Sequence, residues 1–143
     1  MSDAEQLVGR WRLVSWTAVD GEGRVAHPMG DRPDGVGVYL PDGWMAVQVA
    51  ATDRPAPSGS DAFAVPEPEQ ARAFATYLAY AGRYAVRGDT VVHRVEMSLY
   101  PQWVGTEQVR RYRFDDGELV LRPPPVESHG RVVTHELRWR RES

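Results

Sequence analysis

Short segments of alternating apolar and polar residues, separated by tight-turn dipeptides, run through most of this chain. The dipeptides are Asp42-Gly43, Gly88-Asp89 and Asp116-Gly117. Such pairs favour the two-residue turns that join neighbouring antiparallel strands, and alternation with a period of two is typical of strands with one buried face. We therefore expect the chain to fold as a series of antiparallel hairpins.

About eight strands and one helix follow from this pattern. The helix is predicted over 66–80, between strands three and four, because apolar residues recur there at helical spacing. Closing such a sheet on itself removes its exposed edges. We expect an all-β fold, a single eight-stranded antiparallel up-and-down barrel, with one domain over residues 1–143. The predicted strands are 9–19, 35–40, 44–49, 82–86, 90–99, 106–114, 118–121 and 132–140, and 20–34 is predicted as a loop.

Missing residue types exclude several kinds of chemistry. The chain has no cysteine, so disulfides, thiolate catalysis and cysteine-ligated metals are ruled out. All 17 basic residues are arginine, so no lysine can form a Schiff base or bind phosphate in a Walker-type loop. Histidines 27, 129 and 135 are scattered, so we expect no metal and no cofactor. The absence of lysine, asparagine and isoleucine indicates a GC-rich gene, and hence a bacterial source.

Charge and hydropathy give expectations about partners and location. The formal net charge is -3, which does not indicate a nucleic-acid or membrane partner. No apolar run approaches the ~20 residues that a membrane helix needs. The N-terminal residues are acidic and have no apolar stretch behind a basic start, so the expected location is cytoplasmic.

Register across the predicted turns places a mainly apolar set of residues on one face of the sheet. Two-residue turns pair Tyr84 with His93 and Tyr112 with Leu121. That face has the composition of a ligand cavity, apolar with a few polar groups gathered together. The other predicted pairs are Val86–Val91, Gly82–Val95 and Phe114–Leu119; across the longer connection, a symmetric pairing gives His93–Tyr112, Val95–Arg110 and Met97–Gln108.

His93 and Arg110 are the candidate catalytic residues. A histidine titrates near neutral pH, so His93 can act as a general acid or base or orient a ligand; alternatively it is a core histidine bonded to a tyrosine. An arginine inside a barrel needs a partner, which is either a ligand anion or a protein acid. The candidate ligand-binding residues are Tyr84, Tyr112, Gln108, Met97 and Tyr39.

The first predicted hairpin offers two faces. Tyr39 and Gln48 share one of them, whereas Val36, Val38, Met45 and Val47 share the other. The valine-rich face is expected to be buried. On the outer face of the later strands, Arg83, Arg94 and Arg111 form a row of like charges, which nearby acids must relieve if the register is right.

Several segments resemble the bacterial lipocalin-like domain proteins, which are calycin-type β-barrels. They are Gly9-Arg10-Trp11 near the start, Tyr39-Leu40-Pro41-Asp42-Gly43-Trp44-Met45, Trp103-Val104-Gly105-Thr106-Glu107-Gln108-Val109-Arg110 and the closing Leu137-Arg138-Trp139-Arg140-Arg141. The resemblance implies a barrel with an internal cavity, and a Trp11 side chain packed against Arg140 or Arg141. It also implies that some similar barrels act as cyclases or isomerases in natural-product pathways.

Three hypotheses about function follow. The first is a barrel that holds a small apolar or aromatic molecule. The second is a cofactor-independent cyclase or isomerase acting on a polyketide-like secondary metabolite, with His93 as acid or base and Arg110 stabilising negative charge. The third is an interaction module that uses the arginine-rich outer face. A cavity containing His93 and Arg110 favours the first two; the oligomeric state stays open, with a homodimer as one alternative.

Overall fold

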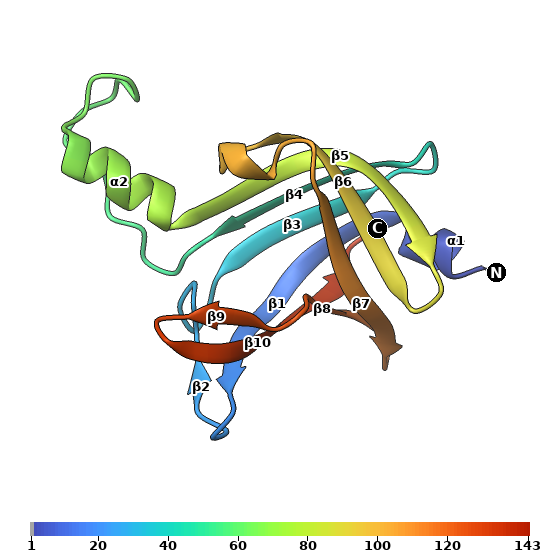
Figure 1. The fold of residues 1–143 in the computed structure, drawn as a ribbon. Coiled ribbons are helices and arrows are strands. Elements are labelled where there is room, and N and C mark those ends of the chain that lie inside the picture. Colours follow the sequence, from blue (N-terminus) through green and yellow to red (C-terminus); the bar gives the residue numbers. More distant parts are fainter. Residues whose placement is uncertain (1) are drawn as a thin grey trace.

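The computed structural model describes residues 2–143 and shows a closed antiparallel barrel. The strands β1, β3, β4, β5, β6, β7, β8 and β10 pair in this order, and β10 pairs back with β1 (Figure 1). The predicted barrel of eight antiparallel strands is confirmed. The elements are α1 (Asp3–Leu7), β1 (Gly9–Asp20), β2 (Val25–Ala26), β3 (Asp34–Tyr39), β4 (Trp44–Ala50), α2 (Glu67–Ala75), β5 (Tyr77–Arg87), β6 (Thr90–Ser98), the 3-10 turn η1 (Pro101–Trp103), β7 (Glu107–Asp115), β8 (Glu118–Arg122), β9 (Val126–Ser128) and β10 (Arg131–Arg141).

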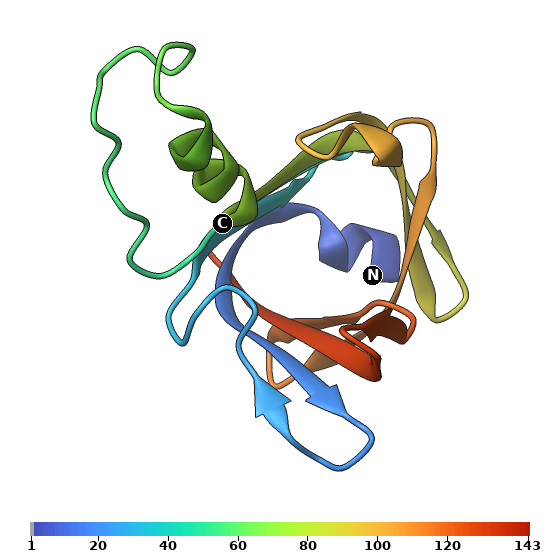
Figure 2. The same cartoon turned by 60° about the vertical axis from the view of Figure 1, so that its left-hand side comes forward.

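Helix α2 lies between β4 and β5, not between the third and fourth strands as expected. The count differs because the short strand β2 forms within 20–34, which was predicted as a loop. The helix is also shorter than 66–80, because Tyr77 already pairs with Ala50 of β4. Sheet pairing therefore prevails over the helical periodicity of an exposed segment. Helix α2 buries none of its side chains and projects from the barrel (Figure 2).

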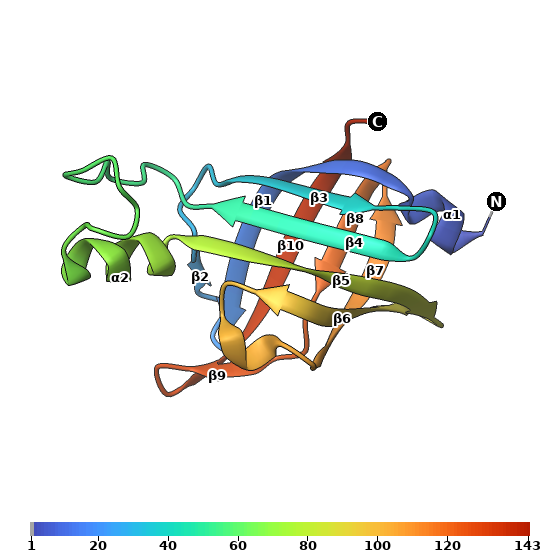
Figure 3. The ribbon, with the colours of Figure 1, turned by 90° about the horizontal axis from the view of Figure 1, so that it is seen from above.

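Helix α1, which the sequence did not predict, covers one end of the barrel. Figure 2 shows it across the barrel opening, and Figure 3 shows it at the end opposite α2. Its Leu7 side chain is 0% exposed, and the Leu7 carbonyl accepts a hydrogen bond from Trp11 Nε1 at 2.8 Å. The guanidinium of Arg141 lies 4.3 Å from the Trp11 ring centroid. The tryptophan–arginine contact implied by the resemblance is therefore present, with Arg141 as the arginine. Among residues 2–143, no helix is long and apolar enough to cross a membrane.

The predicted pairings of the β5–β6 and β7–β8 hairpins are confirmed, whereas the predicted pairing of β6 with β7 is wrong. Tyr84 pairs with His93, and the pairs of the β7–β8 hairpin also form as predicted. Across the longer connection, Arg110 pairs with Val91 and Gln108 with His93, so the symmetric pairing is wrong by four residues. Because a shift of four leaves side chains on the same face, His93, Gln108 and Arg110 still point inward.

A β-bulge in β6 overturns the prediction for Met97. Gly82 of β5 pairs with Val95, but the next residue, Ala81, pairs with Met97, so Glu96 is the extra residue. One extra residue reverses the alternation beyond it. Met97 consequently lies outside the cavity and is 61% exposed.

The β3–β4 hairpin also differs from the prediction by one residue. Tyr39 pairs with Met45, which leaves the three residues Pro41, Asp42 and Gly43 in the loop instead of two. Gly43 has a φ of +91°, as expected for the last position of such a loop. The inward face therefore carries Tyr39, Met45, Val47 and Val49, whereas Val36, Val38 and Gln48 lie on the other face.

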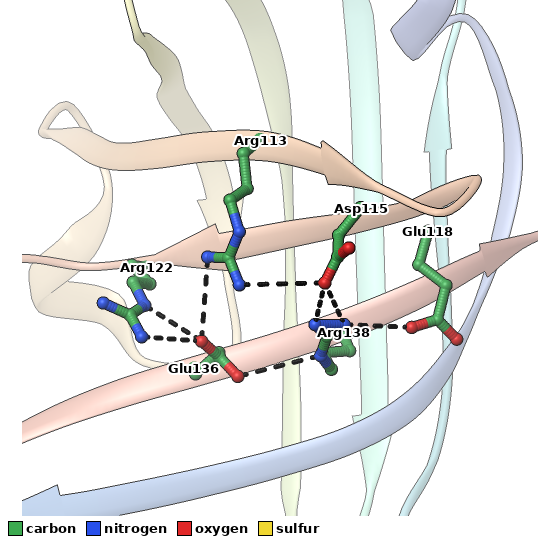
Figure 4. Close-up of polar contacts among 6 residues, drawn as sticks. All are labelled: Arg113, Asp115, Glu118, Arg122, Glu136 and Arg138. Atoms are coloured by element: carbon green, nitrogen blue, oxygen red, sulfur yellow. Dashed lines mark hydrogen bonds and ion pairs between the residues drawn. The ribbon is translucent and has the colours of Figure 1, made fainter.

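Acidic residues neutralise much of the arginine-rich outer face. Arg83 and Arg94 do pair across β5 and β6, but Arg94 faces Glu107 instead of Arg111. On the outer surface of β7, β8 and β10, three arginines and three acids form a continuous network (Figure 4). Ion pairs within the chain thus engage several of the arginines on which the interaction-module hypothesis depends. The network consists of Arg113, Asp115, Glu118, Arg122, Glu136 and Arg138.

Candidate ligand-binding cavity

The barrel encloses a cavity of about 500 Å³, a size suited to a small organic molecule. Its walls are mostly apolar, and four tryptophans contribute to them. The polar side chains come from β3, β5, β6, β7 and β10. The principal lining residues are Trp11, Trp16, Tyr39, Met45, Val47, Val49, Leu78, Tyr80, His93, Trp103, Gln108, Arg110, Leu119, Leu121, His135, Leu137 and Trp139.

The cavity opens where β7 and β8 separate. Residues 107–110 of β7 pair with β6 alone, because pairing with β8 begins at Arg111 and ends at Arg122. The chain then continues as three prolines, which cannot donate backbone hydrogen bonds. The exposed residues Glu107, Pro124 and Val126 belong to the lining, so this gap forms the mouth.

His93 is held between two tyrosines at the centre of the polar region. It is 2% exposed; Nε2 lies 2.7 Å from the Tyr39 hydroxyl and Nδ1 lies 2.7 Å from the Tyr80 hydroxyl. Both ring nitrogens are therefore already hydrogen-bonded. This arrangement favours a role in orienting the tyrosines over proton exchange with a ligand.

Burial keeps all three members of this group neutral. It lowers the pKa of His93 to about 3, with a further lowering by the positive charge of Arg110. Burial also raises the pKa of Tyr39 and of Tyr80, and Arg110 opposes part of both rises. At neutral pH the group therefore consists of one imidazole and two phenols without charge.

Arg110 lines the cavity without an acidic partner. Its Nη1 donates to the Val109 carbonyl at 3.1 Å, and it forms no ion pair with any carboxylate of residues 2–143. The structure therefore contradicts the alternative that a protein acid neutralises Arg110. It is also the only arginine among the described lining residues.

Three further polar side chains line the cavity. Gln108 Nε2 donates to Thr106 Oγ1 at 3.0 Å. His135 Nδ1 accepts from Trp16 Nε1 at 2.9 Å, so the hydrogen of neutral His135 resides on Nε2. Trp139 Nε1 is buried and has no hydrogen-bond partner within the described part of the chain. The polar part of the wall is thus rich in donors.

Two of the predicted ligand contacts lie at the closed end of the barrel instead. The Tyr84 hydroxyl donates to the Leu40 carbonyl at 2.7 Å, and the Tyr112 hydroxyl donates to Asp3 of α1. Neither residue lines the cavity, and neither does Met97. Of the predicted site residues, the fold therefore brings together His93, Arg110, Gln108 and Tyr39.

Comparison with protein families identifies the family of this chain. A family model described as a lipocalin-like domain matches residues 8–142. The chain belongs to the lipocalin-like domain family. Two solved structures of variants of the fluorescent protein UnaG align over 97% and 96% of the chain, with 15% and 13% identity and TM-scores of 0.43 and 0.39.

A curated relative of this lipocalin-like chain comes from the fungus Aspergillus oryzae. It is a 4'-hydroxy-3'-methoxypropiophenone carrier protein, 39% identical over 74 residues, with 46% of this chain and 67% of the relative covered. Because that relative is fungal, the comparisons do not support the expected bacterial origin.

The lipocalin-like cavity contains polar residues that sequence reasoning did not select. Tyr80 was assigned to the end of a helix, so its place on an inward-facing strand was missed. His135 was treated as scattered, although its strand places it opposite Ala18, beside the Trp16 side chain on the inner wall. The alternation of β10 could have predicted that His135 faces inward, because His135 and Trp139 are four residues apart and so share one face of the strand. Among the described residues, no group of His, Asp and Glu is arranged to hold a metal ion.

Proposed function

We propose that this lipocalin-like protein binds a small aromatic molecule inside its barrel and carries it. The observation that supports the proposal is the cavity itself, about 500 Å³ with apolar and aromatic walls and one compact polar region. Such a pocket removes an apolar ligand from water and orients it through a few polar contacts. The mouth between β7 and the proline run gives a route for entry.

The curated relative supports the same proposal. Its name describes a carrier of 4'-hydroxy-3'-methoxypropiophenone, an aromatic ketone with a phenol group. The ketone, hydroxyl and methoxy oxygens of that compound can all accept hydrogen bonds, and the cavity wall here offers donors. We therefore take this compound as the first probe.

The cyclase or isomerase alternative has one supporting observation, which is the guanidinium of Arg110 beside neutral phenols. These groups can stabilise developing negative charge. An acid or base in contact with the substrate is also needed, and both nitrogens of His93 are occupied by tyrosines. The geometry therefore favours binding as the primary function.

The test uses the intrinsic tryptophans. Trp11, Trp16, Trp103 and Trp139 line the cavity, so a bound aromatic ketone should quench their fluorescence in a saturable manner. Native mass spectrometry of protein purified from its own host should in addition reveal any ligand already bound. Absence of both saturable quenching and a bound mass would contradict the proposal.

A further inference from the structure

The cavity holds a positive charge that the chain does not neutralise. The Arg110 guanidinium donates to the Val109 carbonyl and interacts with the neutral Tyr80 hydroxyl, so neither partner is an anion, although a guanidinium has five N–H donors. The lining contains one carboxylate, that of Glu107, which pairs with Arg87 at 3.6 Å and not with Arg110. By contrast, the adjacent Arg111 reaches Asp89 at 3.0 Å on the outer face. A half-buried cation without a counter-ion is costly, and a ligand anion removes that cost.

The ionisable groups around Arg110 do not supply the missing negative charge. Burial raises the pKa values of Tyr39 and Tyr80, so both stay as phenols at neutral pH. Burial also lowers the pKa values of His93 and His135, so neither histidine adds a second positive charge. The polar region therefore carries one unit of positive charge.

Counting hydrogens gives a second, independent indication. Neutral His93 has one N–H, and Tyr39 and Tyr80 have one O–H each, which makes three hydrogens for the two bonds that link these residues. In either tautomer of His93, one phenol hydrogen is left without an acceptor in the group. Among residues 2–143, neither hydroxyl has another acceptor within hydrogen-bond distance. The group thus presents a spare donor beside the Arg110 guanidinium.

We infer that the cavity selects aromatic molecules that carry an acidic oxygen, as a carboxylic acid or as a phenol or enol conjugated to a carbonyl, and binds them as anions against Arg110 and the spare tyrosine hydroxyl. The inference rests on the proposed binding function and specifies its ligand class. Charge-assisted hydrogen bonds from a guanidinium are about twice as strong as neutral ones, so the anion gains more than an uncharged molecule of the same shape. The apolar walls supply affinity for the ring.

The experiment compares three naphthalenes of similar shape and different charge. Isothermal titration calorimetry at pH 7 measures the affinity of the full chain for 2-naphthoate, neutral 2-acetylnaphthalene and cationic 2-(aminomethyl)naphthalene. We expect 2-naphthoate to bind about tenfold or more tightly than the ketone, as charge-assisted bonds imply, and the cation to bind most weakly. Arg110→Met should abolish the preference for the anion but retain binding of the ketone.

Two further variants make the outcomes decisive. Arg111→Met removes an adjacent arginine from the outer face and should leave all three affinities unchanged. Arg110→Lys keeps the charge and should restore part of the preference, which guards against a result caused by misfolding of Arg110→Met. Equal affinities for anion and ketone would overturn the inference and leave the proposed function intact. If none of the three compounds binds, the result contradicts both the inference and the proposed binding function.

Discussion

The hydroxyl of Tyr39 lies 2.7 Å from Nε2 of His93, although 54 residues separate the two in sequence. The Tyr80 hydroxyl lies at the same distance from Nδ1. These two bonds tie β3 and β5 to β6 inside the barrel and satisfy both nitrogens of a buried imidazole. The first consequence concerns stability, because a buried polar atom that loses its partner is costly.

Tyr39→Phe should lower the free energy of unfolding by about 1–3 kcal/mol, because it leaves His93 Nε2 buried without a partner. Urea denaturation followed by circular dichroism measures the change. Tyr84→Phe is the matched control, since the Tyr84 hydroxyl bonds to a carbonyl at a more exposed position, and it should cost less than about 1 kcal/mol. Equal losses in the two variants would argue against the special role of the His93 contact.

The depressed pKa of His93 predicts acid sensitivity. Its pKa falls from 6.5 to about 3 on folding, so between these values the unfolded chain binds a proton that the folded chain does not. The stability contributed by neutral His93 is complete above pH 6.5 and is lost as the pH falls towards 3. The free energy of unfolding should therefore decrease by about 1.4 kcal/mol per pH unit from this group between pH 6 and pH 4.

Urea titrations at pH 7, 6 and 5 isolate the histidine contribution. The carboxyl groups with lowered pKa, Asp20 and Glu142, have ordinary values of 3.8 and 4.5 and act mainly below this range. His93→Gln, which keeps hydrogen-bonding groups but does not titrate, should show a shallower dependence. The slope that remains should fall further in a double variant with His135→Gln, because the pKa of His135 is also lowered by burial. A slope unchanged in His93→Gln would contradict the assignment.

Hydrophobic alternation and turn dipeptides were sufficient to predict the barrel and to place His93 and Arg110 on its inner wall. The prediction for Arg110 survived a wrong β6–β7 register because the error was an even number of residues. Asp116-Gly117 forms the expected two-residue turn, with φ of +52° and +82°. Where the loop length followed directly from the dipeptide, the faces were predicted correctly.

The orientations of Tyr39 and Met97 depended on single-residue irregularities that the sequence pattern does not indicate. Asp42-Gly43 is compatible with two-residue and three-residue loops, and the longer loop turned Tyr39 inward with Met45. The bulge at Glu96 turned Met97 outward. The inward position of Tyr80 was missed because apolar residues recur at helical spacing in a segment that includes the start of strand β5. The sequence therefore did not predict that Tyr39 and Tyr80 both form hydrogen bonds with His93.

The closed end of the barrel should depend on Arg141. Its guanidinium stacks on Trp11 at 4.3 Å and donates to the Val8 carbonyl at 2.7 Å. Arg141→Leu should lower the free energy of unfolding by about 1–3 kcal/mol, measured by urea denaturation, because it removes the cation–π contact and leaves that carbonyl unpaired. Arg140→Leu, at the exposed neighbouring position, should change it by less than about 0.5 kcal/mol. A reversed order would contradict the stacking assignment.

The β6 bulge should make Gly82 difficult to replace. A Cβ built on Gly82 would lie 1.9 Å from the Arg94 carbonyl oxygen, which belongs to the backbone and cannot move aside cheaply. Gly82→Ala should destabilise the barrel by about 2–3 kcal/mol in thermal or urea unfolding. Gly21→Ala, whose Cβ would have no neighbour within 4 Å, should be nearly neutral. A tolerated Gly82→Ala would mean that β5 and β6 approach less closely than described.

Filling the cavity tests the proposed function without touching its polar groups. Val47 is buried and lines the cavity opposite Gly37, so Val47→Phe places an aromatic ring in the space assigned to the ligand. We expect affinity for 4'-hydroxy-3'-methoxypropiophenone to fall by about tenfold or more in fluorescence titrations.

Thermal melts separate loss of space from loss of fold in the same variant. The melting temperature of Val47→Phe should stay close to that of the parent, because the ring enters space that is otherwise empty. Gln48→Phe adds the same ring one residue along on the outer face and should leave the affinity unchanged. If Val47→Phe melts normally and still binds with full affinity, the ligand lies elsewhere and the internal cavity is not the binding site.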